Sequence, residues 1–482
     1  MTATAAEGTE QPLVAAGATI PEVAYRTALA AFALAVVAAA AVAAPDSGAV
    51  FLGRFFGAAI LRAHSVPLQL GAETFTAAGA YDGGIGWLGA LTISLLAAAG
   101  PAALVFATML AALATFALVE LRARRAAGRP LGLAAAALAG LCALGSFGVA
   151  GGIVTAAFAA ALAYVLERPG PRAAALGTLI ALVWCNAAPQ GLLAPVIGLC
   201  SVAGVTFGAA SPSDRRWARL ALAGTVLATL ATPALLAYPA LALEGLRIDR
   251  ALAGVVSINP IEVAPLGYRI GFTLVVLVAC ALGIARGREG TIPLLLFGTL
   301  LALANGAYVV VFGVLVAPLL AASAAAAFPA FARGSARAPR ADFASAGFAV
   351  VLAAVVAWQA GQRPAPLNGG FALATTLAAD GRAHRLYCWN LDWCDAVLSS
   401  SPRVAVFMDG RVAAYPPDVR SAKADIVSVK ATWRKVLNER RVDAMLVAKD
   451  HALAGLLALS PEWRAVDADD SAVLYERTAV AR

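Results

Sequence analysis

Acidic and basic side chains meet in the loop that follows the first apolar segment. Asp46 opens this loop, and Arg54 and Arg62 lie eight residues apart in an otherwise apolar stretch. That spacing places both arginines near one face of a helix lying at a membrane surface. A carboxylate there can take a proton from a hydroxyl or hold a metal ion, and arginines can hold a phosphate. Asp46 is therefore a candidate base or metal ligand, with Glu73 as a second carboxylate, and the arginines are candidate phosphate contacts.

These residues also have a structural interpretation. Asp46 can cap a helix, and the two arginines can extend their charged ends toward lipid headgroups. The loop composition alone does not decide between the two.

Further polar residues lie in or near apolar segments, where such groups are costly and mark functional sites. Asn186 is one of them, although it can equally hydrogen-bond a neighbouring helix. Glu262 lies between Pro260 and Pro265, which favours a loop at the mouth of a cavity, and Arg269 can pair with it.

The last part of the chain offers a second group of candidates. Asp409 and Arg411 flank Gly410 directly after an expected strand, where they either contact a ligand or form a salt-bridged tight turn. Cys388 and Cys394 can form a disulfide in an oxidising compartment, or remain as two buried thiols. No Cys/His set has the spacing of a metal site, so no metal ligands are assigned.

The elements that position these residues are mostly apolar. The chain has 61% hydrophobic and 13% charged residues, far from the composition of soluble domains. Eleven or twelve apolar runs between residues 24 and 360 are candidate membrane helices. We therefore expect a polytopic α-helical membrane protein, in which a disordered tail (1–23) precedes the helical region (24–360) with its first loop at 45–86. A linker (361–380) and a small C-terminal α/β domain (381–482) complete the chain.

Arginines between the apolar runs set the expected orientation. The net charge of +8 comes from short arginine clusters, which typically lie in cytoplasmic loops, so it does not indicate nucleic-acid binding. The cluster from Arg333 to Arg340 precedes the last run, which puts the C-terminal domain outside the cytoplasm. The number of crossings among the first three segments, and hence the side of the N-terminus, stays open.

Alternating short strands and helices are expected in the C-terminal domain, with a largely parallel sheet and an antiparallel edge. The expected strands are His384–Cys388, Arg403–Met408, Val442–Val447, Trp463–Val466 and Ala472–Tyr475, and the expected helices are Trp393–Ser399, Thr432–Arg440 and Ala452–Ser460.

The order of these features resembles the GT-C superfamily of integral-membrane glycosyltransferases, in a divergent bacterial branch with a C-terminal soluble domain. The first loop contributes Gly57, Ile60, Pro67, Phe75, Gly79 and Trp87-Leu88, and the helices contribute Trp184-Cys185-Asn186, Thr232-Pro233 and Ile261-Glu262. The tail contributes Tyr387-Cys388-Trp389, Trp393-Cys394, Val406-Phe407-Met408-Asp409-Gly410-Arg411, Tyr415-Pro416, Trp433, Val442-Asp443, Trp463 and Asp467.

Three polar positions of that branch are absent. Its Asp-x-Trp-Trp-His stretch is missing from the first loop, with Ala49 near the position of the acid. Ala188 replaces a histidine, and Asn305-Gly306 replaces an arginine pair.

The resemblance implies transfer of a sugar from a polyprenyl-phosphate donor to an extracytoplasmic acceptor, with a divalent cation as a possible cofactor. It also implies a location in a bacterial inner membrane. Asn186, Glu262, Arg269, Asp409 and Arg411 would then contact substrate. The missing positions favour an alternative, a non-catalytic membrane component that binds a glycan or a partner protein. A transporter ranks below both, because the apolar runs offer few charged residues.

Overall fold

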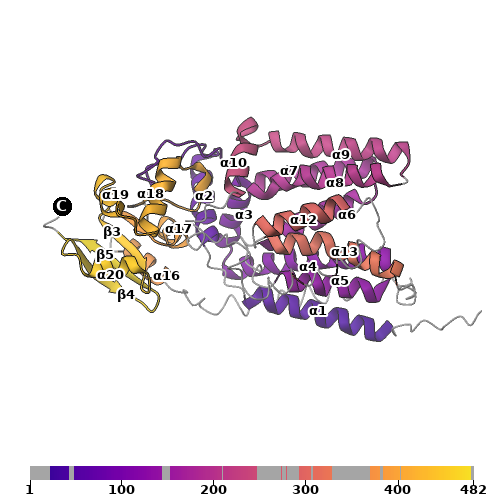
Figure 1. Ribbon diagram of the computed structural model, residues 1–482, viewed down its shortest axis with the longest axis horizontal. Coiled ribbons are helices and arrows are strands. Elements are labelled where there is room, and N and C mark those ends of the chain that lie inside the picture. Colours follow the sequence, from indigo (N-terminus) through magenta and orange to yellow (C-terminus); the bar gives the residue numbers. More distant parts are fainter. Residues whose placement is uncertain are drawn as a thin grey trace, which may run out of the picture.

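The computed structural model describes residues 22–42, 48–143, 152–208, 210–246, 273, 278, 292–304, 308–327, 370–379, 384–401 and 403–478. A bundle of helices forms one end of the molecule and a small domain with a sheet forms the other (Figure 1). Asp46, Glu262 and Arg269, together with the expected N-terminal tail up to residue 21, lie outside the described residues.

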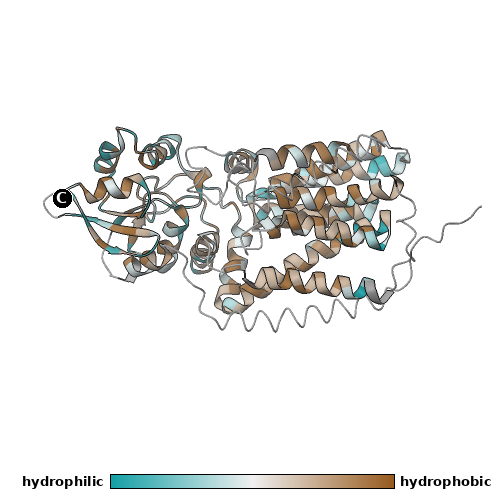
Figure 2. Cartoon of the chain, turned by 60° about the horizontal axis from the view of Figure 1, so that its bottom comes forward, coloured by the Kyte–Doolittle hydropathy of each residue, from teal (hydrophilic) through white to brown (hydrophobic). Residues whose placement is uncertain are grey.

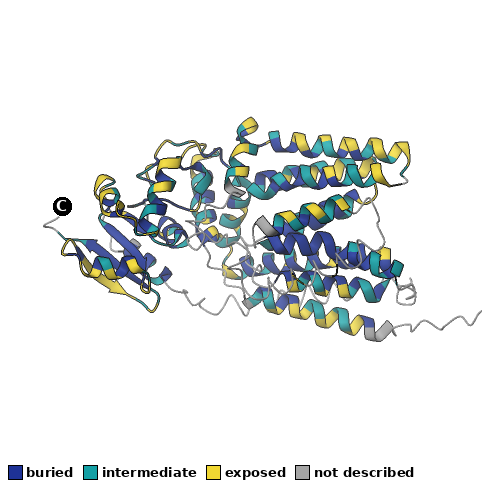
Figure 3. Ribbon diagram, viewed as in Figure 1, coloured by how far each residue is buried: buried dark blue, intermediate teal, exposed yellow. Residues whose placement is uncertain are grey.

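Ala-rich helices pack closely in the bundle, because small side chains let helix backbones approach one another. The bundle helices are α1 (Glu22–Val42), α4 (Pro101–Ala127), α5 (Arg129–Cys142), α6 (Gly152–Leu166), α7 (Pro171–Ala187), α8 (Leu193–Phe207), α9 (Pro212–Leu230), α10 (Tyr238–Leu246), α12 (Ile292–Ala304) and α13 (Val309–Ala327). Helix α13 is apolar on every side and lies in the centre, against α4, α5, α6 and α12. Figure 3 shows it as the most continuously buried helix of the bundle.

Three stretches of the described chain are long and apolar enough to cross a membrane: Pro101–Ala127, Pro189–Phe207 and Val309–Ala327. Pro212–Leu230 and Leu235–Glu244 pass the same test together but are bent by 108°, which gives a fourth if the pair counts as one span. Five further apolar helices have 10–17 residues. The described part of the chain is therefore mostly helical and compatible with a membrane protein, with three or four candidate spans.

The start of α1 can be placed relative to the end of α4. The Tyr25 hydroxyl donates to the Glu120 carboxylate at 2.5 Å, and Arg129 lies over the Tyr25 ring. The start of α1 and the end of α4 are therefore neighbours, at the bundle end away from the sheet (Figure 1). Helix α3 (Trp87–Ala98), between them in sequence, has 12 residues. That is too short for a full crossing, which needs about 20 residues.

Helix α2 (Gly48–Ala63) lies between the bundle and the C-terminal domain, in contact with α3 on one side and α17 (Leu391–Ser400) on the other. Glycines allow this close packing: a Cβ at Gly57 would lie 2.4 Å from the Ala90 carbonyl oxygen, and one at Gly48 would lie 2.5 Å from the Asp392 Cα. Any larger residue at these positions would separate the three helices.

All five predicted strands are present and form one sheet with the order β2-β1-β3-β5-β4. Strands β1 (His384–Cys388), β2 (Val404–Val406) and β3 (Ala444–Ala448) are parallel, whereas β5 (Ala472–Arg477) and β4 (Trp463–Ala468) form an antiparallel edge. The expected mixture of parallel and antiparallel strands is therefore confirmed. In Figure 2 the sheet is brown inside and teal along its outer strand.

Helices cover both faces of the sheet. On one face α16 (Phe371–Ala379) and α17 pack in one apolar cluster. On the other face lie α18 (Pro417–Val427), α19 (Trp433–Glu439) and α20 (Ala452–Ala458). Helix α16 lies in the range expected to be a linker. Its apolar residues Phe371, Leu373 and Leu377 are buried against α17, so the folded domain already includes residue 370.

The first loop joins the C-terminal domain as part of its core. Leu70 and Ala77 lie in the same apolar cluster as the buried residues around α18 and α19. Thr74 pairs with Val406 as a parallel bridge, and the Val406 N–H donates to the Glu73 carbonyl at 2.8 Å. The loop thus covers the β2 edge of the sheet, which would otherwise offer unpaired backbone groups to another chain.

Candidate functional site

A buried ion cluster forms where the first loop, α2 and the C-terminal domain meet. The Asp409 carboxylate has no exposed surface and accepts from the Arg411 guanidinium, with Nη2 to Oδ2 at 2.6 Å and Nε to Oδ2 at 3.1 Å. The same Nη2 lies 3.1 Å from Glu73 Oε1 of the first loop. Glu73, Asp409 and Arg411, three residues singled out from the sequence, are therefore in direct contact across more than 300 residues of chain.

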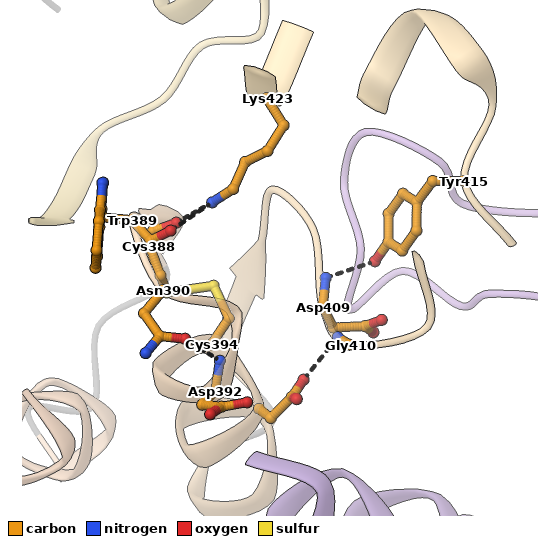
Figure 4. Close-up of a disulfide and its surroundings, with 10 residues drawn as sticks. Cys388, Trp389, Asn390, Asp392, Cys394, Asp409, Gly410, Tyr415 and Lys423 are labelled. Carbon is orange, nitrogen blue, oxygen red and sulfur yellow. Dashed lines mark hydrogen bonds between the residues drawn. A yellow bond between two sulfur atoms is a disulfide. The ribbon is translucent and has the colours of Figure 1, made fainter. Parts of the chain in front are cut away.

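Hydrogen bonds of the turn after β2 hold Asp409 and Arg411 in place. The Asp409 N–H donates to the Tyr415 hydroxyl at 3.0 Å, and the Gly410 N–H donates to Asp395 Oδ1 at 3.0 Å (Figure 4). A Cβ at Gly410 would lie 2.8 Å from Asp395 Oδ2 and 3.2 Å from Leu52 of α2. Glycine at this position therefore lets α17 and α2 approach the turn. Phe56 of α2 also borders the cluster, with its ring centre 5.9 Å from the Arg411 Cζ.

Acidic groups outnumber basic ones in this cluster. Asp82 of the first loop and Asp395 of α17 are both buried and interact electrostatically with Asp409. Burial, with the negative charges of Asp409 and Glu73, raises the pKa of Asp82 to about 6, although Arg411 opposes the shift. Burial and Asp409 also raise the pKa of Asp395 well above its ordinary value. The guanidinium of Arg411 stays charged, because Asp409 outweighs the burial that would lower its pKa.

Asp82 is the acid of this cluster with a pKa near neutral. Its carboxylate takes no hydrogen bond from any described residue, and its pKa of about 6 is close to neutral pH. A base with such a pKa is deprotonated in use and can still accept a proton. No group of three or more His, Cys, Asp or Glu residues suited to hold a metal occurs within the described ranges. The cluster thus places a buried carboxyl with a raised pKa near one guanidinium that Asp409 and Glu73 already hold.

Arg54 and Arg62 lie elsewhere on α2. Both side chains are exposed. Arg54 lies over the Phe51 ring and the Arg62 Nε donates to the Ala58 carbonyl at 3.3 Å. The structure therefore puts the two arginines on one outer face of the helix and leaves them apart from Glu73 and Arg411.

Asn186 connects three elements of the bundle. Its Oδ1 accepts from the Trp87 Nε1 at 2.7 Å, and its Nδ2 donates to the carbonyls of Leu182 and Ala231. Both donors of the amide and its oxygen are thus used within the protein. These contacts agree with the interpretation that Asn186 hydrogen-bonds neighbouring helices. They link the start of α3 to the ends of α7 and α9.

A disulfide joins Cys388 and Cys394, whose Cα atoms are 5.7 Å apart. It ties the end of β1 to α17, the helix that carries Asp395 (Figure 4). Lys423 of α18 reaches the same place from the other face of the sheet: it donates to the carbonyls of Cys388 and Trp389, and its Nζ lies 4.1 Å from the centre of the Tyr387 ring. Burial lowers the pKa of Lys423 well below its ordinary value.

Sequence reasoning did not assign Asp82, Asp395 or Lys423 to the site. One signal for Asp395 was available, since it is the acid inside the apolar run Trp393-Cys394-Asp395-Ala396-Val397-Leu398. Asp82 and Lys423 are ordinary loop and helix residues in sequence, and only their burial distinguishes them.

The chain matches no protein-family model and no curated protein. The resemblance to GT-C glycosyltransferases therefore depends on the motifs alone.

Proposed function

We propose that the protein is a membrane glycosyltransferase of the GT-C type, with eleven or twelve spans and an extracytoplasmic C-terminal domain. It would transfer a sugar from a polyprenyl-phosphate donor at the outer face of a bacterial inner membrane. The observation that carries the proposal is the cluster of Glu73, Asp82 and Asp409 around Arg411, at the junction between an apolar bundle and a polar domain.

The position of the arginines supports this orientation. Arg122, Arg124, Arg125 and Arg129 lie around the end of α4 and the start of α5, near Tyr25 at the far end of the bundle (Figure 1). If that end is cytoplasmic, as arginine-rich loops usually are, then the cluster and the sheet domain lie on the outer side.

Each group has a role in the proposed transfer. Asp82 would take the proton of the acceptor hydroxyl as that oxygen attacks the anomeric carbon, while the bond to the phosphate breaks and the electron pair leaves with the phosphate. Asp46, before α2, remains a second candidate base or cation ligand. Arg54 and Arg62 stay candidate phosphate contacts, because guanidinium groups bind phosphate strongly, although both lie on the exposed side of α2 and apart from the cluster.

The proposal is tested by reconstituting the full chain in liposomes with polyprenyl-phosphate hexose and a membrane glycan extract. The measurement is release of free polyprenyl phosphate by mass spectrometry. Asp82→Asn should lower release at least 100-fold, and Asp418→Asn, an exposed acid of α18, should leave it unchanged. Full activity of Asp82→Asn would remove this residue as the base. Full activity of Asp46→Asn as well would refute the carboxylate mechanism.

Another observation favours a non-catalytic envelope component. Arg411 is already held by Asp409 and Glu73, and the amide of Asn186 is fully hydrogen-bonded, so two candidate substrate contacts serve the fold. The two functions differ in a deletion strain complemented with Asp82→Asn. A scaffold restores normal envelope glycans with this variant, whereas a transferase does not.

A further inference from the structure

A second site is indicated at the same edge of the sheet, where the parallel strands β1 and β3 end side by side. The strand order β2-β1-β3 makes β1 and β3 neighbours. The helix after β1 is α17, and the helix after β3 is α20, and they cover opposite faces of the sheet. Where the helices after two neighbouring parallel strands lie on opposite faces, a crevice opens outside the carboxyl ends of the strands. Ligands of α/β domains bind in this crevice.

Aromatic rings gather at this point. Trp389 follows β1 directly, and its ring centre lies 5.5 Å from that of His451 after β3 and 6.1 Å from that of Trp393. Both Trp389 and His451 are only partly buried. The Trp389 Nε1 is buried and bonds to no group in the described part of the chain. The exposed parts of Trp389 and His451 are therefore the groups that a ligand would contact.

A polar pocket of about 340 Å³ adjoins His451 in the chain, lined by Lys449, Asp450, Asp470 and Ser471. Lys449 and Asp450 follow β3, and Asp470 and Ser471 precede β5, which pairs with β3 through Ala448 and Ala472. The pocket is therefore part of the same edge of the sheet as the aromatic rings. Its side chains offer two carboxylates, one ammonium and one hydroxyl.

The chemistry of this edge favours a neutral polyol over a nucleotide. The loop from β1 to α17 has no glycine, so it lacks the turn that brings backbone N–H groups close to a phosphate. Asp392 in the first turn of α17, and the excess of carboxylates over Lys449 in the pocket, repel anions. Flat aromatic faces beside carboxylates are the groups that a sugar ring needs, with its apolar C–H face and its hydroxyls.

We propose that the β1/β3 edge of the C-terminal domain binds a saccharide. Trp389 and His451 stack on a sugar ring, and Asp450, Asp470 and Lys449 hydrogen-bond its hydroxyls. This binding does not require the transfer reaction, so it holds for a transferase that positions an acceptor and equally for a non-catalytic component.

The test uses the full chain in detergent, immobilised, with four soluble probes: cellohexaose, maltohexaose, mannohexaose and the hexamer of N-acetylglucosamine. At least one should bind. Trp389→Leu keeps apolar bulk, and His451→Asn keeps an acceptor for the Leu453 N–H that the His451 Nδ1 now caps at 3.2 Å. Each should weaken binding at least 10-fold.

Asp470→Asn should fold normally, because this residue is exposed, and it should also weaken binding. It therefore separates loss of binding from misfolding. The matched control is Lys435→Ala, an exposed cation of α19, which should bind normally. The readout is binding of a soluble probe and not release of polyprenyl phosphate, which separates this proposal from the proposed transfer reaction. Binding of none of the four probes, or equal binding by Trp389→Leu, His451→Asn and Asp470→Asn, overturns the proposal.

Discussion

Removal of the Arg411 guanidinium tests the buried cluster most directly. Asp409 is fully buried, and three of its hydrogen bonds come from this guanidinium, at 2.6, 3.1 and 3.3 Å. In Arg411→Met the carboxylate keeps the backbone N–H of residue 411 as a donor and loses its counter-charge. Breaking a buried ion pair on one side costs about 3–5 kcal/mol. That is a large share of a total stability of about 5–15 kcal/mol.

The free energy of unfolding is measured by urea titration of the full chain in detergent, with the melting temperature as a second readout. We expect a fall on the order of 10 °C, at about 2–4 °C for each kcal/mol. The penalty should shrink at pH 5 relative to pH 8, because an unpaired buried carboxyl takes up a proton in acid. Replacing the acid as well, in Arg411→Met with Asp409→Asn, should recover at least half of the loss.

An exposed ion pair of the same domain provides the control. Arg440 lies 3.0 Å from Asp418, and both side chains are about a third or more exposed. Arg440→Met should therefore cost no more than about 1 kcal/mol. The reasoning is refuted if Arg411→Met is no worse than Arg440→Met, if its penalty is the same at both pH values, or if the double variant is as unstable as Arg411→Met.

Three further outcomes follow from the structure. Because the folded state raises the pKa of Asp82 from 3.8 to about 6, it binds more protons than the unfolded chain in this window, and stability falls as the pH rises through it. Asp82→Asn should therefore add up to about 3 kcal/mol at pH 8 and flatten the pH profile of urea unfolding; an unchanged profile contradicts this. Cys394→Ser should lower the free energy of unfolding by about 2 kcal/mol, because the loop-closure entropy is lost, and a reductant should not destabilise this variant further. Gly57→Ala should destabilise the protein, because the new Cβ would meet the Ala90 carbonyl oxygen at 2.4 Å, whereas Gly455→Ala in α20, with open space around it, should stabilise by up to about 1 kcal/mol; equal melting temperatures would contradict the packing of α2 on α3.

The sequence by itself determined the classes of element and the main division of the chain. Apolar runs predicted helices, and alternation of strand-like and helix-like segments predicted the five strands of the C-terminal sheet, because both patterns are local in the chain. It also placed Asp409 and Arg411 at the end of β2, since the glycine between them follows a buried strand. Short helices of mixed polarity are harder to predict from sequence. Helix α18, for example, carries Asp418, Arg420 and Lys423 and shows no clear apolar periodicity.

Tertiary structure decided which residues meet. Glu73 reaches Arg411 only because the first loop pairs with the edge of a sheet more than 300 residues later, and no local pattern encodes that pairing. Burial, which depends on the whole fold, singles out Asp82 among several loop acids and gives it a pKa of about 6. Arg54 and Arg62, by contrast, follow the helix periodicity to an outer face and away from the cluster. A residue's neighbours along the helix can be read from its spacing, but its charge state depends on solvent access and distant partners, which the folded chain alone supplies.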